Sequence, residues 1–319
     1  MTQLSKRTRE KSLVSKVSRV PALLVLTVLV LLFSLSGCGQ AASANNPSTG
    51  GQFQVVSSIG QWSALAQELG GKTVNTQAVI NNPNVDAHDY EPTSSDIGLI
   101  ARADLVIVNG ADYDTWASKA AADNGKQVVN IAQRSGHRSG DNPHLWFSAQ
   151  ARLQAGKAIS HSYQKARPEH KDDFVRMYDL WQAKEKQLGD QLQQGSQQMQ
   201  GMTFAATESA ADYLAADLHL KNVTPRAFAQ AVANEGEPSP ADVHEFEQAL
   251  ATHRAQVLVF NEQEESAVSR QLLAAAKRAG VPVVEVSEQM PTKYTNLTDW
   301  IAALYQSFAQ AAHVAQAAQ

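Results

Sequence analysis

Four side chains that commonly bind metals each follow a run of residues typical of a β-strand. His88 comes after NTQAVI and His144 after QVVNIA, whereas Glu208 closes TFAATES and Glu288 comes directly after VPVVEVS. In open parallel α/β sheets, ligands bind beyond the carboxyl ends of the strands, so we expect these side chains to converge. Two imidazoles and two carboxylates are a donor set suited to Zn²⁺ or Mn²⁺.

His88 lies in the acidic segment NPNVDAHDYEP, which has a proline near each end. Proline fixes its own φ and favours extended geometry in the preceding residue, so we expect a stiff loop. Taken by itself, His88 could cap or hydrogen-bond as readily as ligate, but its convergence with His144 favours ligation. Asp86 and Glu91 are interpreted as groups that support the ligands, because a ligating imidazole usually donates its second N–H to a carboxylate or carbonyl.

Two carboxylates of the second half of the chain have alternative interpretations. Glu208 could cap the helix predicted to follow it, as acidic residues in a first turn often do. Glu262, in the acidic run NEQEES, is a rival to Glu288 for the fourth ligand, although such a run is usually a solvated face. We expect ligation by Glu208 and Glu288.

The strands and helices that would position these residues alternate along two parts of the chain. Val- and Ile-rich runs bounded by turn residues indicate buried strands. The strand candidates are FQVVSS, NTQAVI, DLVIVNG, QVVNIA, TFAATES, VTPRAFA, QVLVFNE and VPVVEVS, which begin at residues 53, 75, 104, 127, 203, 223, 256 and 281. Helices are predicted over 60–71 and 239–254, the latter with Ser239 as N-cap.

Between the two alternating parts, residues 149–200 lack strand signals and are rich in Gln, Lys, Ala and acidic residues, which predicts a long helical stretch with a break near Pro168. We therefore predict an α/β fold of two lobes, each with a mostly parallel four-stranded sheet and flanking helices, joined by a long rigid spine helix. The predicted domains are a signal peptide (1–37), a flexible tether (38–52), an N-terminal metal-binding lobe (53–148), the linking helices (149–200) and a C-terminal metal-binding lobe (201–319).

The N-terminus has the features of an export signal. Basic residues precede the apolar run VPALLVLTVLVLLF, and LSGC follows it, resembling the lipobox of bacterial lipoproteins. Cys38 is the chain's single cysteine, so it has no disulfide partner within the chain, and we expect it to carry a lipid. The expected location is the outer face of the cytoplasmic membrane, with an uncleaved membrane anchor as the alternative.

The charge distribution argues against nucleic acid as a partner. The formal net charge is −4, and because residues 1–37 carry +5, the rest of the chain carries −9. Enzyme motifs such as a Gly-rich phosphate loop, GxSxG, HExxH and CxxC do not occur in the sequence. A site closed by four protein donors also lacks the open position that metal-activated water requires, so we do not expect an enzyme.

Four motifs occur in an order that resembles the metal-binding subunits of bacterial zinc/manganese ABC importers: NPNVDAHDYEPTSSD, ADLVIVNGADYDTW, NPHLWFS and ATESAADYLA. The resemblance implies a monomeric solute-binding lipoprotein with two lobes, in which His88, His144, Glu208 and Glu288 hold the metal. It also implies an ABC permease as partner. Family members of the zinc type often have His at the third position and those of the manganese type Glu, whereas Zn²⁺ binds most N/O sites more tightly than Mn²⁺. The metal is therefore left open between the two.

Two other functions fit the same residues. The chain could be a surface metal-scavenging protein or adhesin without a transporter, or it could bind an organic ligand such as a siderophore in the same fold. A siderophore site calls for aromatic or cationic residues at the strand ends, where this chain has His and Glu.

Capture of a metal by histidine predicts a metal affinity that falls as the pH is lowered, because the ligating imidazoles must be neutral.

Overall fold

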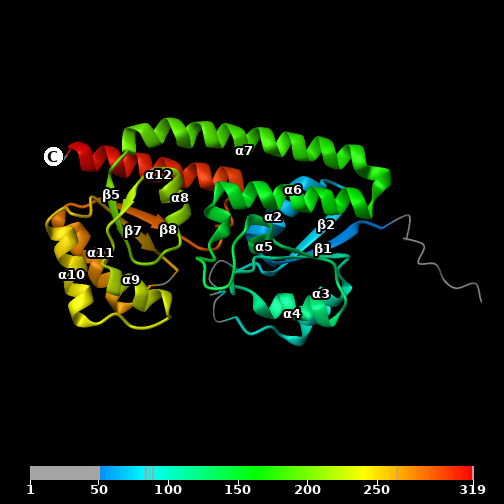
Figure 1. Cartoon of the computed structure of the whole chain (residues 1–319), viewed down its shortest axis with the longest axis horizontal. Coiled ribbons are helices and arrows are strands. Elements are labelled where there is room, and N and C mark those ends of the chain that lie inside the picture. Colours follow the sequence, from blue (N-terminus) through cyan, green and yellow to red (C-terminus); the bar gives the residue numbers. More distant parts are fainter. Residues whose placement is uncertain (1–50, 83–84, 86, 88–89, 264, 318–319) are drawn as a thin grey trace, which may run out of the picture. The chain divides into compact units, whose positions relative to one another are not determined.

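Each lobe is built on a parallel sheet of four strands, with strand orders β2-β1-β3-β4 and β6-β5-β7-β8. The computed structural model describes residues 51–82, 85, 87, 90–263 and 265–317 (Figure 1). Both sheets belong to one unit, Gln52–Gln319. The predicted fold class is thus confirmed. The predicted signal peptide, Cys38, Asp86 and His88 lie outside the described residues.

The N-terminal sheet places its most apolar strands at its centre. Its strands are β1 (Phe53–Ile59), β2 (Val74–Ile80), β3 (Leu105–Val108) and β4 (Val128–Asn130). Its helices are α2 (Gly60–Gly70), α3 (Ser94–Arg102), α4 (Thr115–Asp123) and α5 (Ile131–Ser135). Every residue of β3 is buried, as expected for a parallel strand covered by helices on both faces. The edge strand β2 is only partly buried.

The C-terminal sheet repeats this topology, but its first two strands are shorter than their counterparts in the N-terminal sheet. Its strands are β5 (Thr203–Ala206), β6 (Lys221–Asn222), β7 (Val257–Asn261) and β8 (Val283–Val286). Its helices are α8 (Asp212–Asp217), α9 (Arg226–Ala233), α10 (Pro240–Ala251), α11 (Ala267–Ala279) and α12 (Leu297–Ala317). Ser239 caps α10 as predicted, with its hydroxyl accepting a hydrogen bond from the Asp242 amide.

The strand predicted from Val223 in VTPRAFA is wrong. The strand β6 ends at Asn222, and Arg226–Ala233 forms α9 with Pro225 at its N-cap. Proline cannot donate to a sheet ladder but is accepted at a helix start, which ends one element and begins the other. Phe228, buried against the lobe, and Val232 lie four residues apart on one face of α9.

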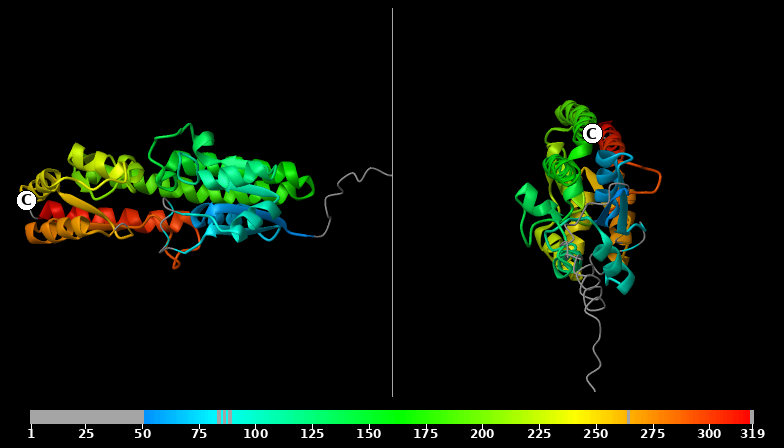
Figure 2. Two further views of the ribbon diagram at one scale, coloured as in Figure 1. Left: turned by 90° about the horizontal axis from the view of Figure 1, so that it is seen from below. Right: turned by 90° about the vertical axis from the view of Figure 1, so that its right-hand side faces the viewer.

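Two long helices connect the lobes through the predicted break. Helix α6 (Ala149–Ala166) ends before a short 3₁₀ turn, η2 (Pro168–His170), and α7 (Lys171–Met199) follows. Helix α7 contacts α2 and α6 as well as α12, which runs alongside it (Figure 1 and Figure 2). In the part of the chain that the structure describes, no helix is long and apolar enough to cross a bilayer.

Candidate metal centre

The site gathers three side chains, His144 from the N-terminal lobe and Glu208 and Glu288 from the C-terminal lobe. Nε2 of His144 lies 3.4 Å from Oε1 of Glu208 and 3.4 Å from Oε2 of Glu288. Each of the three residues offers one ligand atom, and these three atoms all lie within 4.8 Å of one another. Four donors placed tetrahedrally at about 2.1 Å from Zn²⁺ lie roughly 3.4 Å from one another. The spacing of these donor atoms therefore suits a small divalent cation.

His144 is fully buried and its ring orientation is fixed by Asn142. The Oδ1 atom of Asn142 accepts a hydrogen bond from the His144 backbone amide at 3.0 Å and lies 2.7 Å from Nδ1 of the same residue. Because that oxygen can only accept, Nδ1 carries a proton, and Nε2 is the ring nitrogen that faces the two carboxylates. The ring also packs edge-on against Trp146.

The segment between β4 and His144 contains a short helix. Helix α5 lies between β4 and His144, which itself precedes a 3₁₀ turn, η1 (Leu145–Phe147). Asn109, directly after β3, donates through Nδ2 to the Pro143 carbonyl at 2.8 Å, and its Oδ1 accepts from Trp62. Side chains at the end of the central strand therefore hold the backbone beside the imidazole.

Asn261 connects the two carboxylates and is a residue that the sequence analysis did not identify. It is the last residue of β7, and its Nδ2 donates to Oε2 of Glu208 and, at 2.9 Å, to Oε1 of Glu288. Tyr113, from the loop after β3, donates its hydroxyl to Oε2 of Glu288 at 3.2 Å. The position of Asn261 at the carboxyl end of a parallel strand is the signal that could have pointed to it.

The loop carrying Tyr113 is held by a buried carboxylate. Asp114 accepts hydrogen bonds from the backbone amides of Asn109 and Gly110 at 2.6 and 2.9 Å. Burial raises the pKa of Asp114 above its ordinary value. The backbone turns through positive φ at Gly110, Ala111 and Asp112, which redirects the chain toward the site.

Hydrogen bonds from the His144 loop also cross to the C-terminal lobe. Asn142 donates through Nδ2 to the Ser209 carbonyl at 2.8 Å, and its own carbonyl accepts from the Tyr213 hydroxyl at 2.9 Å. Ser209 directly follows Glu208 in the sequence. The loop that bears the imidazole is thus bonded to the segment that bears one of the carboxylates.

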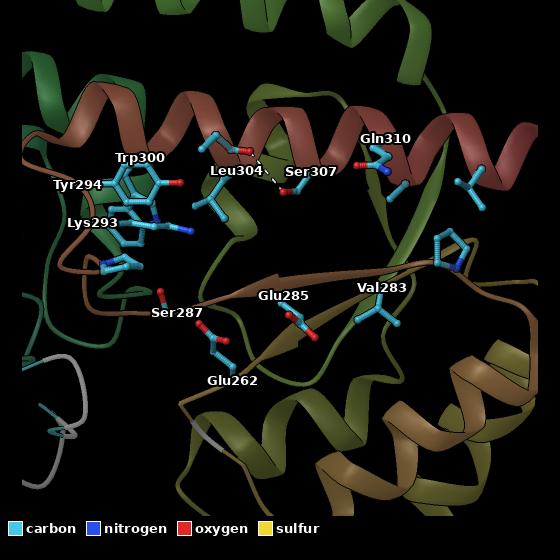
Figure 3. A pocket seen from close by; sticks show the side chains of 15 residues that line it. Glu262, Val283, Glu285, Ser287, Lys293, Tyr294, Trp300, Leu304, Ser307 and Gln310 are labelled. Carbon is cyan, nitrogen blue, oxygen red and sulfur yellow. Dashed lines mark hydrogen bonds between the residues drawn. The ribbon is translucent and has the colours of Figure 1, made fainter.

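The remaining predicted site residues lie elsewhere. Glu91 is exposed and is not among the grouped donors of the described residues. Glu262 is exposed and lines another pocket of about 570 Å³, between β8, the segment after it and α12 (Figure 3). Glu208 lies before the first turn of α8, which begins at Asp212, and the N-cap residue of that helix is Ala211, which makes no side-chain capping bond.

The fold is typical of a class of two-lobed ligand-binding proteins. It has two parallel α/β lobes, a long helix that spans them and a polar site formed by side chains of both lobes. A family model described as "Zinc-uptake complex component A periplasmic" matches residues 55–311, and the chain belongs to this family. This confirms the resemblance inferred from the four sequence motifs.

Individual relatives are distant. The zinc-binding lipoprotein AdcA of Streptococcus pneumoniae is 22% identical over 275 residues, which cover 80% of this chain and 53% of AdcA, so the chain spans about half of that relative. The manganese-binding lipoprotein MntA of Bacillus subtilis is 28% identical over 182 residues, 51% of this chain and 58% of MntA. The structure of the periplasmic zinc-binding protein TroA from Treponema pallidum matches with a TM-score of 0.69 at 18% identity, covering 82% of this chain and 99% of TroA.

Proposed function

We propose that this protein captures a divalent transition metal, Zn²⁺ or Mn²⁺, outside the cell and delivers it to the permease of an ABC importer. The observation that carries the proposal is the spacing of 3.4 Å from Nε2 of His144 to an oxygen of each of Glu208 and Glu288. His88 is the fourth ligand expected from the sequence. Membership of the zinc-uptake family and the zinc- and manganese-binding relatives support the same function.

Binding of a metal would fasten the two lobes together. His144 belongs to the N-terminal lobe, and Glu208 and Glu288 belong to the C-terminal lobe, so a cation joins them directly. Helix α7 packs against elements of both lobes and resists a wide hinge motion. Release therefore takes the form of a small shift of the segment around Glu288, which the permease favours by binding the open state more tightly.

The location proposed for the protein is the outer face of the cytoplasmic membrane, where a lipid on Cys38 would retain it as a monomer. Relatives named as lipoproteins support this placement. Catalysis is not part of the proposal. The donors converge on one cation, and a site filled by protein ligands has no open position at which water could be activated.

The experiment is a metal-binding measurement on the purified protein after removal of metals with a chelator. Zn²⁺ and Mn²⁺ affinities are determined by competition with a chromophoric indicator. The variants are His88→Ala, His144→Ala, Glu208→Ala, Glu288→Ala and Glu262→Ala, with His161→Ala, an exposed histidine of α6, as the matched control. We expect each ligand variant to lose at least tenfold in affinity, as expected when one charge-assisted donor is removed.

Two results would decide against the assignment. A parent protein that takes up neither metal at micromolar concentrations would end the proposed function. An unchanged affinity in Glu288→Ala combined with a loss in Glu262→Ala would transfer the ligand position assigned to Glu288 to Glu262.

A further inference from the structure

The carboxamide of Asn261 has a fixed orientation. The side chain is only 1% exposed, and its Oδ1 accepts a hydrogen bond from the Gln263 backbone amide at 3.1 Å. The Asn261 backbone amide donates to Oγ1 of Thr207 at 3.0 Å. Because Oδ1 is engaged by a donor, the NH₂ group is the end that faces the carboxylates.

That NH₂ group divides the oxygens of each carboxylate between two partners. It donates to Oε2 of Glu208 and to Oε1 of Glu288, and the other oxygen of each carboxylate lies 3.4 Å from Nε2 of His144. One oxygen of each side chain is thus directed at Asn261 and the other at the imidazole, and the second oxygen of Glu288 also accepts a hydrogen bond from Tyr113. This arrangement presents a single oxygen of each carboxylate to a cation at the centre of the site.

We propose that Asn261 is a positioning residue that determines which metal the site prefers. Asn261 limits Glu208 and Glu288 to one ligating oxygen each. This favours Zn²⁺, which accepts four ligand atoms, over Mn²⁺, which prefers six ligand atoms, mostly oxygens. The inference rests on the proposed function, because it concerns the same site.

The physical reason is the cost of chelation by both oxygens of a carboxylate. To bind a cation with both oxygens, Glu208 or Glu288 must rotate so that the oxygen now bonded to Asn261 turns to the metal. The buried NH₂ group then loses one of its two acceptors, so one of its N–H bonds is left without a partner, which weakens binding of a high-coordination metal by roughly tenfold to a hundredfold. Zn²⁺ accepts four ligands and needs no such rotation, whereas octahedral oxygen-rich sites suit Mn²⁺.

The test compares metals and coordination number in the parent, Asn261→Ala and Asn261→Ser. Affinities for Zn²⁺ and Mn²⁺ are measured by indicator competition, and the visible spectrum of the Co²⁺-loaded protein reports coordination number, since four-coordinate Co²⁺ absorbs far more strongly than six-coordinate Co²⁺. Asn222→Ala, an exposed asparagine at the end of β6 on the same sheet, is the matched control. Circular dichroism establishes that each variant is folded.

In Asn261→Ala we expect the preference for Zn²⁺ over Mn²⁺ to fall by about tenfold or more and the Co²⁺ absorption to weaken. Asn261→Ser keeps one hydroxyl donor and should change in the same direction by less, and it decides the question if Asn261→Ala does not fold. Asn222→Ala should match the parent.

An unchanged metal preference and an unchanged Co²⁺ spectrum in the folded Asn261 variants would overturn the inference while leaving the proposed function intact. A parent protein that binds neither Zn²⁺ nor Mn²⁺ would overturn the proposed function itself. The two failures are therefore distinguishable.

Discussion

A buried ion pair joins three helices near the site and gives a quantitative test of the structure. Arg152 of α6 and Glu185 of α7 are 1% and 5% exposed, and Nε of the arginine lies 3.0 Å from Oε2 of the glutamate. Nη1 of Arg152 donates to the Trp146 carbonyl at 3.0 Å, and Thr298 of α12 donates to Oε1 of Glu185 at 2.8 Å. The ion pair thus connects helices α6 and α7 with the backbone of Trp146, two residues after His144.

Removing one partner should be far more damaging than removing both. Arg152→Met leaves the Glu185 carboxylate buried without its cation, which costs about 3–5 kcal/mol in the free energy of unfolding. At about 2–4 °C per kcal/mol for a chain of this size, the melting temperature should fall by roughly 6–20 °C. In Arg152→Met/Glu185→Met both charges are absent, and we expect at least about 2 kcal/mol of the loss to be recovered.

The assay is urea unfolding of the metal-free protein, followed by circular dichroism, for the parent, both single variants and the double variant. Lys184→Met is the control, because Lys184 lies at the surface of α7, the helix that also carries Glu185, and pairs there with Glu68 of α2. This exposed pair should contribute no more than about 1 kcal/mol to the free energy of unfolding. The reasoning is refuted if the double variant loses as much as the two single variants together. It is also refuted if Arg152→Met is no less stable than Lys184→Met.

Four further outcomes follow from single positions. Gly156→Ala should lose about 1–3 kcal/mol of unfolding free energy in a melting experiment, because the added Cβ would overlap the Trp181 ring. Gly189→Ala, on the exposed face of α7 with open space around it, should instead gain about 0.5–1 kcal/mol. Burial raises the pKa of Asp212 from 3.8 to about 6, so this group favours the folded state below about pH 4 and that contribution is lost as the pH rises through 6. Asp212→Asn should therefore be more stable than the parent at pH 7, by at most about 3 kcal/mol, and its melting temperature should vary less between pH 4 and 6. Zn²⁺ affinity should decrease as the pH is lowered, because His144 must be neutral to ligate, and a competing indicator measures this directly.

The fold was predictable because its central strands carry a strong local signal. Runs such as LVIV in β3 are apolar throughout, as strands covered on both faces must be. The error at VTPRAFA arose because β6 has only two residues and both are exposed, so no buried pattern marks it. Val223 and Phe228 gave an apparent strand pattern, whereas Pro225 was the residue that separates the strand from the helix.

The ligand candidates were predictable in a way that their supporting groups were not. Glu208 and Glu288 follow the ends of β5 and β8 by two residues, where carboxylates seldom lie without a partner, so residue type and position point to them together. For His144 the residue type and the NPHLWFS motif were the signal, because α5 separates it from β4. Asparagines such as Asn142 and Asn261 are common at turns and strand ends. Their roles depend on which oxygen or nitrogen each one meets in the folded chain, and sequence patterns do not encode that geometry.

The contacts of Glu288 support the proposal that release of a metal is a local event in this fold. Gln61 and Tyr113, both of the N-terminal lobe, donate to its backbone carbonyl and to its carboxylate at 2.6 and 3.2 Å. Gln263, of the C-terminal lobe, accepts from its backbone amide at 2.6 Å. Separation of the lobes as rigid bodies would break the first two bonds in a buried environment, where each lost partner costs about 1–3 kcal/mol. A shift of the segment around Glu288 can exchange these bonds one at a time, so movement of that segment is the cheaper route to an open site.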